Sequence, residues 1–82
     1  MHYMIAFVLI STEIGSEREV LEELRKLEEI KEAYVVFGVY DIVAKIVASN
    51  VEDLKSIVSN KIRRIPHVKT TLTMIVAEGF VK

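Results

Sequence analysis

The side chains best placed to do chemistry lie in a turn near the middle of the chain, residues 37–41 (FGVYD). Apolar stretches of strand length flank this turn, which predicts the tip of a β-hairpin. Gly38 can take the left-handed backbone conformation that tight turns use, and it would leave its amide and carbonyl approachable. Asp41 supplies a carboxylate, which is the partner of an ammonium group such as that of a free amino acid. The turn therefore predicts a receptor for a small charged molecule.

Two interpretations of Asp41 stay open from the sequence. Aspartate is favoured in turns because its carboxylate accepts hydrogen bonds from nearby backbone amides, so Asp41 is as readily a structural residue as a ligand. Tyr40 would wall the pocket, although a hairpin aromatic more often packs on its own sheet. In the last apolar stretch, Thr71 and Thr73 share a face and could bind a carboxylate, but threonine is also an ordinary strand residue.

Several other kinds of site find no support in the composition. The chain has no cysteine, which excludes disulfides, thiolate metal sites and thiol catalysis, and which suits a reducing cytoplasm. Its histidines, His2 and His67, do not stand at ligand spacing from another strong metal ligand on a helix. No serine has a matched base and orienting acid. We therefore expect no metal, no cofactor, no catalytic residue and no enzymatic activity.

Charge and hydropathy argue against nucleic acid and membranes as partners. The formal net charge is -1, with 11 basic and 12 acidic residues spread along the chain, so no polyanion-binding surface is expected. Residues 42–48 lack the aromatic side chains with which RNA-recognition domains of βαββαβ topology stack bases. No apolar run is long enough to cross a bilayer.

The elements that position these residues follow from periodicity. We expect strands at 2–10, 33–37, 42–48 and 67–77, an amphipathic helix from residue 17, and a second helix that begins at Ser49 or Asn50 and ends near Arg64, before Pro66. This order, βαββαβ, predicts an α+β, ferredoxin-like fold with a four-stranded antiparallel sheet and two helices on one face. The length allows a single domain, residues 1–82.

Apolar residues on both faces of the sheet predict a dimer. The chain is 51% apolar, and the segments 2–10 and 42–48 offer apolar side chains to both sides of a sheet. If both helices cover one face, the other would be left apolar in water. Two such sheets are therefore expected to stack face to face.

Three segments carry a resemblance to a known family: residues 38–43 (GVYDIV), 65–68 (IPHV) and 71–76 (TLTMIV). They resemble the effector-binding domain of the leucine-responsive/asparagine-type (Lrp/AsnC) regulators, also called the RAM domain, and the resemblance runs over essentially the whole chain. It implies a dimeric α+β barrel formed through sheet faces, and assembly of dimers into rings. It also implies that an amino-acid effector binds between dimers, with the match falling on Gly38, Tyr40, Asp41, Thr71, Thr73 and Met74. Val39 completes the effector-binding set that we predict at the hairpin.

Two departures from the family pattern bear on function. His67 stands where the family usually has glycine after its proline, which concerns the shape of that turn and the choice of ligand. Full-length members carry an N-terminal helix-turn-helix, whereas the first strand here begins almost at Met1. We therefore expect a stand-alone effector domain that does not contact DNA directly.

Three functional hypotheses remain. The leading one is a non-enzymatic, homo-oligomeric amino-acid sensor that modulates a DNA-binding Lrp/AsnC regulator by co-assembly. The second is a small cofactor-free oxygenase of the dimeric ferredoxin-like-barrel type, which needs polar groups inside a cavity; His2, Tyr3 and Tyr34 are the candidates. The third is a purely structural assembly subunit.

Overall fold

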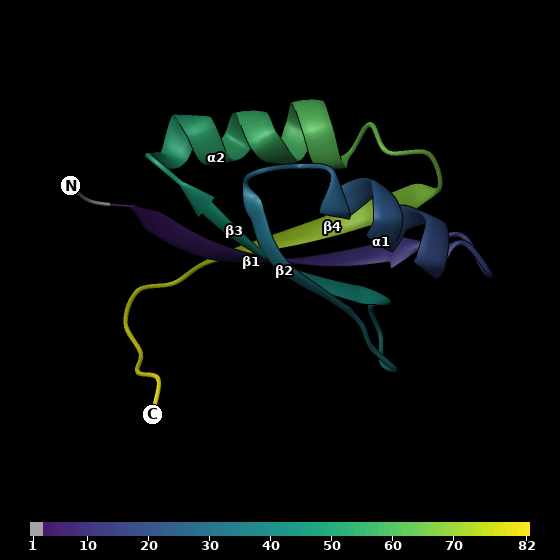
Figure 1. Cartoon of the computed structure of the whole chain (residues 1–82), viewed down its shortest axis with the longest axis horizontal. Coiled ribbons are helices and arrows are strands. Elements are labelled where there is room, and N and C mark those ends of the chain that lie inside the picture. The colour runs from purple at the N-terminus through teal and green to yellow at the C-terminus, as the bar shows by residue number, and fades with distance from the viewer. Residues whose placement is uncertain (1–2) are drawn as a thin grey trace.

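The computed structural model describes residues 3–82 and has the predicted order of elements (Figure 1). They are β1 (Met4–Thr12), α1 (Glu17–Arg25), β2 (Ile30–Val35), β3 (Ile42–Ala48), α2 (Val51–Ile57), a π-helical turn η1 (Val58–Ile62) and β4 (Val68–Ile75). The strands form a four-stranded sheet in the order β2-β3-β1-β4, and each pairs antiparallel with its neighbours. Both helices lie on one side of this sheet (Figure 1). The predicted ferredoxin-like α+β fold is confirmed.

The hydrophobic core fills the space between the sheet and the helices. Alternate residues of β1 and β3 point into it, and α1 contributes Val20 and Leu24. The largest fully buried side chains are Ile10, Leu24, Ile42, Ile46, Ile57, Ile62, Val8 and Val20. Burying one such side chain is worth about 1.5–3 kcal/mol. This interface is therefore the main source of stability within one copy.

The other side of the sheet, which we call the open face, carries no helix. The strand registers place there Ile5, Phe7, Leu9, Val43, Val47, Leu72 and Met74, with Glu32, Tyr34 and Lys45. None of these side chains is buried. The predicted apolar character of both faces of β1 is thus present in the structure.

Helix α2 begins with a reciprocal cap. The Asn50 side chain accepts a hydrogen bond from the Asp53 amide at 2.7 Å, and the Asp53 carboxylate accepts one from the Ser49 amide at 3.0 Å. Such a cap satisfies amides that have no partner in the first helical turn. Of the two predicted caps, Asn50 is the one used.

Strand and helix ends differ from the predicted ones where the pairing is irregular. β2 begins at Ile30 rather than at residue 33, because Ile30 pairs with Ile46 across a register shift. β1 runs on to Thr12, which pairs with Val68 after a second shift. The regular helix ends at Ile57 and passes into the π-helical turn before residue 64. The alternation of apolar and polar residues along a strand does not reveal such irregularities in pairing.

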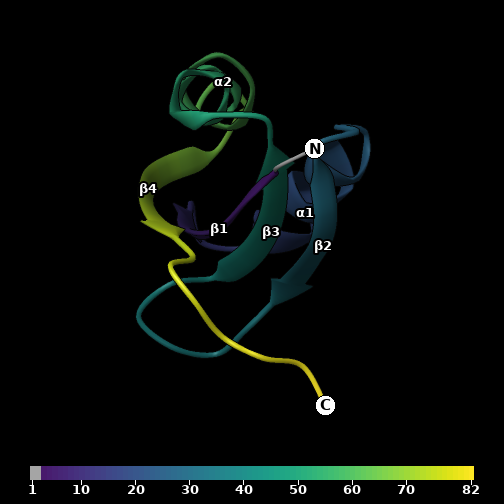
Figure 2. The same ribbon diagram turned by 90° about the vertical axis from the view of Figure 1, so that its left-hand side faces the viewer.

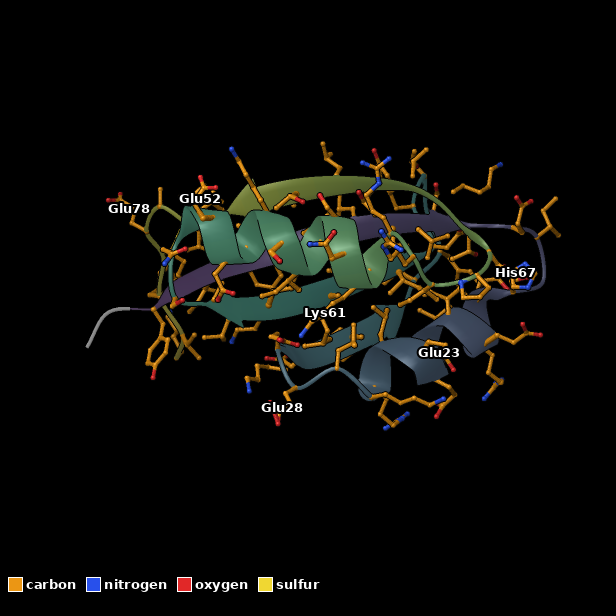
Figure 3. All side chains as sticks on the ribbon, turned by 90° about the horizontal axis from the view of Figure 1, so that it is seen from above. Glu23, Glu28, Glu52, Lys61, His67 and Glu78 are labelled. Atoms are coloured by element: carbon orange, nitrogen blue, oxygen red, sulfur yellow. The ribbon has the colours of Figure 1, made fainter. Side chains whose placement is uncertain are left out.

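An ion pair joins the end of the second helical segment to the loop after α1. Lys61 Nζ lies 2.5 Å from Glu29 Oε2. Figure 3 shows Lys61 on the side of the second helical segment that faces α1. The hydrogen bond from Lys61 lowers the pKa of the Glu29 carboxyl, and the same bond raises the pKa of Lys61.

Replacing Lys61 by methionine is expected to lower the free energy of unfolding slightly at pH 7, because the ion pair with Glu29 is lost and because this pair is partly exposed. A lowered carboxyl pKa stabilises the fold above the ordinary pKa of glutamate, and this contribution is lost as pH falls through the lowered value. The difference between wild type and Lys61→Met should therefore shrink as the pH falls below the ordinary pKa of glutamate and through the lowered value. Urea unfolding at pH 7 and at a series of lower pH values measures it.

Lys55→Met is the matched control, because Lys55 lies exposed on α2, directly before the π-helical turn that carries Lys61, and forms no ion pair within residues 3–82. An equal loss in both variants would contradict a specific role of the Glu29 pair.

Candidate functional site

Asp41 fastens the β2–β3 hairpin to the end of β1. Its Oδ2 accepts a hydrogen bond from the Thr12 amide at 2.8 Å, and the Thr12 hydroxyl lies 3.5 Å from the same oxygen. The Asp41 amide donates to the Ile10 carbonyl, and its own carbonyl accepts from the Val36 amide. For Oδ2, the structural interpretation of Asp41 is therefore correct: this carboxylate oxygen accepts a hydrogen bond from a backbone amide. Thr12, which is buried, was not singled out from the sequence because it lies 29 residues away.

Gly38 does not adopt the left-handed conformation that we expected. Among residues 3–82, positive φ angles occur at Gly15 (83°) and His67 (76°) only. The turn is spread over the loop 36–41, so no single residue has to reverse the chain. A Cβ atom on Gly38 would lie 4.0 Å from the Tyr40 carbonyl oxygen and meet nothing closer. The backbone at Gly38 is nevertheless exposed and open to a ligand.

The tip of the hairpin is apolar and reaches into solvent. Phe37 and Val39 are almost completely exposed, while Tyr40 and Asp41 are half-buried. Figure 1 shows the hairpin leaving the sheet on the side away from the helices. An apolar tip of this kind offers a contact surface to another molecule.

The predicted residues of β4 lie on two different faces of the sheet. Thr71 pairs with Ile10 and Thr73 with Val8, so both threonines are on the helix side. Met74 pairs with Phe7 and is on the open face. Ile10 pairs in turn with Ile42, which places Thr71 at the hairpin end of the sheet. Two strand spacings, about 10 Å, separate β4 from β3. Within one copy Thr71 therefore shares the hairpin end of the sheet, whereas Thr73 and Met74 lie beside the middle of β1, and the predicted residues do not form a single pocket.

His67 holds a backbone conformation that glycine adopts most easily. Its φ angle is 76°, and its carbonyl accepts a hydrogen bond from the Glu13 amide at 2.9 Å. The imidazole Nε2 lies 3.6 Å from Glu19 Oε2. Figure 3 shows His67 at the end of the molecule where β1 leads into α1. The turn before β4 thus keeps its left-handed shape with a histidine side chain in place.

A polar group interrupts the open face. Lys45 Nζ lies 3.3 Å from Glu32 Oε2, and the Tyr34 hydroxyl donates to Glu32 Oε1 at 2.7 Å. The hydrogen bond from Tyr34, together with that from Lys45, lowers the pKa of the Glu32 carboxyl. The same contact raises the pKa of Tyr34. These three side chains are the only charged or phenolic ones that the registers place on this face within β1 to β4.

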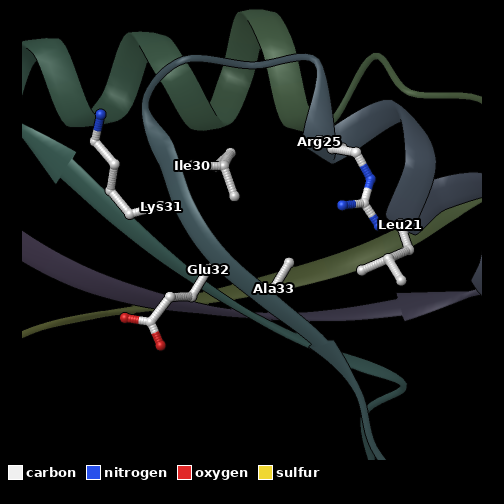
Figure 4. Close-up of a pocket in the computed structure, with 6 residues that line it drawn as sticks. All are labelled: Leu21, Arg25, Ile30, Lys31, Glu32 and Ala33. Atoms are coloured by element: carbon white, nitrogen blue, oxygen red, sulfur yellow. The ribbon is translucent and has the colours of Figure 1, made fainter.

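The cavity between α1 and β2 does not gather polar groups (Figure 4). It measures about 200 Å³ and is lined by Leu21, Arg25, Ile30, Lys31, Glu32 and Ala33. The Arg25 guanidinium is held by Glu22 at 3.1 Å, and Figure 4 shows Lys31 and Glu32 pointing away from Leu21. Among residues 3–82 no three metal-binding side chains cluster. No helix in the described part is long and apolar enough to span a membrane.

Comparison with known proteins gives a consistent result. A family model, the Lrp/AsnC ligand binding domain, matches residues 5–82. The HTH-type transcriptional regulator FL11 of Pyrococcus abyssi is 47% identical over 73 residues, which are 89% of this chain and 48% of that protein. The chain thus spans about half the length of the curated relatives that it matches.

Two solved structures share the fold. The crystal structure of FFRP-DM1 is 44% identical, covers 89% of this chain and 97% of its own, and has a TM-score of 0.85. A transcriptional regulator from Neisseria meningitidis in complex with L-Met is 16% identical, covers 96% of this chain and 53% of its own, and has a TM-score of 0.86. At that identity the second likeness concerns the fold alone.

Asp41→Ala is expected to lower the free energy of unfolding by about 1–3 kcal/mol, because the buried Thr12 amide loses its acceptor. Asp41→Asn should cost clearly less, since the asparagine side-chain oxygen can still accept that hydrogen bond. Urea unfolding of the two variants at pH 7 checks the order. Equal losses would contradict the role of the Thr12 contact.

His67→Gly is expected to be more stable than His67→Ala by about 1 kcal/mol, because only glycine takes a positive φ without steric cost. Both variants lose the exposed contact with Glu19, so that contact cancels in the comparison. Thermal unfolding of the pair measures the difference. Equal melting temperatures would mean that the left-handed turn costs nothing here.

Proposed function

Since the chain belongs to the Lrp/AsnC ligand binding domain family, we propose that it is a non-enzymatic, amino-acid-binding regulatory module. The observation that carries this proposal is the exposed hairpin end of the sheet, where Asp41 and Gly38 lie within a family-wide match over residues 5–82. A module of this kind would act in the cytoplasm on transcription regulators of its own family.

In the proposed complex, Asp41 and Gly38 each bind one of the two charged ends of the amino acid. Asp41 uses Oδ2 for Thr12, and the contacts recorded among residues 3–82 leave Oδ1 for the ligand's ammonium group. The exposed amide of Gly38 suits a carboxylate. Val39 and Tyr40 would border the site, as the family resemblance implies.

The remaining predicted residues, Thr71, Thr73 and Met74, would reach such a ligand only from another copy. In one copy they lie on two faces of β4, about 10 Å or more from the hairpin strand. We therefore infer that the site is completed where copies meet, in a ring of dimers. L-methionine belongs in the first panel of ligands, because a regulator with this fold was crystallised with it.

The dimer proposed here forms through the open face. Its aliphatic and aromatic side chains are too numerous to remain in water, and stacked sheets about 10 Å apart would bury them. A stable interface buries roughly 800 Å² on each partner, which is within reach of a four-stranded sheet. Co-assembly with a DNA-binding relative would use the same surfaces.

The alternatives have less support. The oxygenase hypothesis needs polar groups within a cavity, but Tyr34 lies on the open face and Tyr3 is largely exposed. Its third candidate, His2, lies outside the described residues. The helix–sheet space is filled by aliphatic side chains. A purely structural subunit would have the same fold and form the same dimer. It would not bind an amino acid, so a binding experiment distinguishes it from a sensor.

A panel of the twenty amino acids should contain at least one that raises the melting temperature saturably. Binding of a ligand at about 100 times its Kd stabilises the folded state by about 2.7 kcal/mol. Asp41→Asn should abolish the shift, because it removes the charge that meets the ammonium while keeping the acceptor for Thr12.

Glu52→Gln is the control for this panel, because it neutralises an exposed carboxylate at the start of α2. A flat response to every amino acid, or a shift that survives Asp41→Asn, counts against the proposed site.

Met74→Glu should convert the dimer into monomers, because it places a charge beside Phe7 on the open face, within the proposed sheet interface. Val51→Glu is the matched control: Val51 is 42% exposed and Met74 is 45% exposed, but Val51 lies on α2, on the other side of the sheet. Sedimentation equilibrium at low micromolar concentration distinguishes the two species. A wild-type monomer, or dissociation in both variants, would refute this interface.

A further inference from the structure

A groove runs between the second helical segment and the edge strand β4. Figure 2 shows α2 and β4 together on one side of the molecule, with α1 and β2 on the other. The groove has a volume of about 260 Å³ and is formed by side chains of residues 51–59 and of β4. Small-molecule sites measure roughly 300–1,000 Å³, so this groove suits a ligand of only a few non-hydrogen atoms.

The helical wall of the groove is built from residues that recur at intervals of four. Val51, Lys55 and Ser59 follow one another at this spacing and therefore share one side of the helix. Leu54 and Val58 also line the groove and are buried, so they form its floor. The wall passes from α2 into the π-helical turn at Val58, and such turns frequently lie at functional sites.

The opposite wall belongs to the edge of the sheet. Thr73 pairs with Val8 and Ile75 pairs with Ala6, and both partners are buried beneath the helices. The side chains of Thr73 and Ile75 therefore point to the helix side, where they line the groove. Both remain exposed. The groove is thus open to solvent and is formed within a single copy.

The polar groups of the groove suit an anion. Among the described residues, Lys55 is the only charged one that lines it. Within residues 3–82 the Lys55 ammonium forms no ion pair, and neither the Ser59 hydroxyl nor the Thr73 hydroxyl forms a hydrogen bond. A carboxylate accepts hydrogen bonds from an ammonium and from hydroxyls. The three groups together therefore offer donors to a carboxylate.

The rest of the lining favours an aliphatic ligand over an amino acid. The other side chains that line the groove are all aliphatic: Val51, Leu54, Val58 and Ile75. An ammonium group on the ligand would lie close to Lys55, and it would find no carboxylate among the described lining residues to offset the repulsion. The groove is therefore unsuited to the class of ligand proposed for the hairpin.

We propose that this groove binds a short-chain aliphatic carboxylate that carries no ammonium group. Lys55, Ser59 and Thr73 bind the carboxylate, and the aliphatic lining holds the carbon chain. The groove is a separate site from the one proposed at the hairpin, because Ile75 pairs near the start of β1, whereas Asp41 contacts Thr12 at the end of that strand. The protein would then respond to a carbon skeleton both with and without its amino group.

Methyl NMR tests the site on the intact chain, because the aliphatic lining supplies the probes. Isovalerate is the ligand, since it is L-valine without the ammonium group. Its titration should move the signals of Val51, Leu54, Val58 and Ile75 saturably and leave that of Val39, at the hairpin, in place. Isovalerate that moves the Val39 signal instead, or that moves none saturably, would overturn the proposal.

Two relatives of isovalerate test the chemistry of recognition. Isovaleramide has the same shape without the charge, and it should bind the groove about fivefold more weakly. L-valine should also bind the groove more weakly, because its ammonium group would lie beside Lys55. Equal affinities of the three compounds for the groove would contradict the proposed selectivity.

Lys55→Met should weaken isovalerate binding by about fivefold, whereas Lys55→Arg should keep most of it, because it retains the charge. Lys61→Met is the matched control: it removes the same charge from the second helical segment, but Lys61 pairs with Glu29 on the side that faces α1 (Figure 3). An equal loss of affinity in Lys55→Met and Lys61→Met would indicate a general effect of net charge and would overturn the proposed site. A flat response to the amino-acid panel would contradict the hairpin site alone and leave this one in place.

Discussion

Side chains of one strand alternate between the two faces of a sheet, and β1 supplies apolar residues to both. Val8 and Ile10 lie under the helices, while Phe7 and Leu9 point to the open face. Two short helices can cover only one face of a four-stranded sheet. We propose that the other face is covered from outside the chain, by a second copy. The proposed dimer and a site completed between copies both depend on this constraint.

The fold could be predicted because local sequence patterns indicate each of its helices and strands. Apolar runs of strand length, two amphipathic segments and Pro66 after the second of them give the order βαββαβ without any knowledge of contacts. What the patterns could not supply were the irregular places. The bulge after Ile30, the one before Thr12 and the π-helical turn at Val58–Ile62 each depend on a partner strand or on packing that a single segment does not reveal.

The sequence predicted the position of the hairpin turn, while the binding role of its residues stays a prediction. The hairpin was found because glycine and aspartate between apolar strands are strong turn signals, yet the conformation assigned to Gly38 was wrong, since a longer loop shares the reversal. The hydrogen bond between Thr12 and Asp41 joins segments that are far apart in the sequence, so no local sequence pattern predicts it. Alternation did place Thr71 and Thr73 together, and the family resemblance added Met74, which lies on the opposite face.

The polar group of the open face has a consequence for the choice of partner. Glu32, Lys45 and Tyr34 satisfy one another while the face is in water. If another sheet covers them, these groups lose their water, and the desolvation cost of several kcal/mol per ion is offset only by the pair itself and by polar atoms that the other surface offers. An identical copy, related by two-fold symmetry, always presents the same group. In the proposed assemblies, a diverged relative whose open face lacks such polar atoms would therefore be a poorer partner than an identical copy.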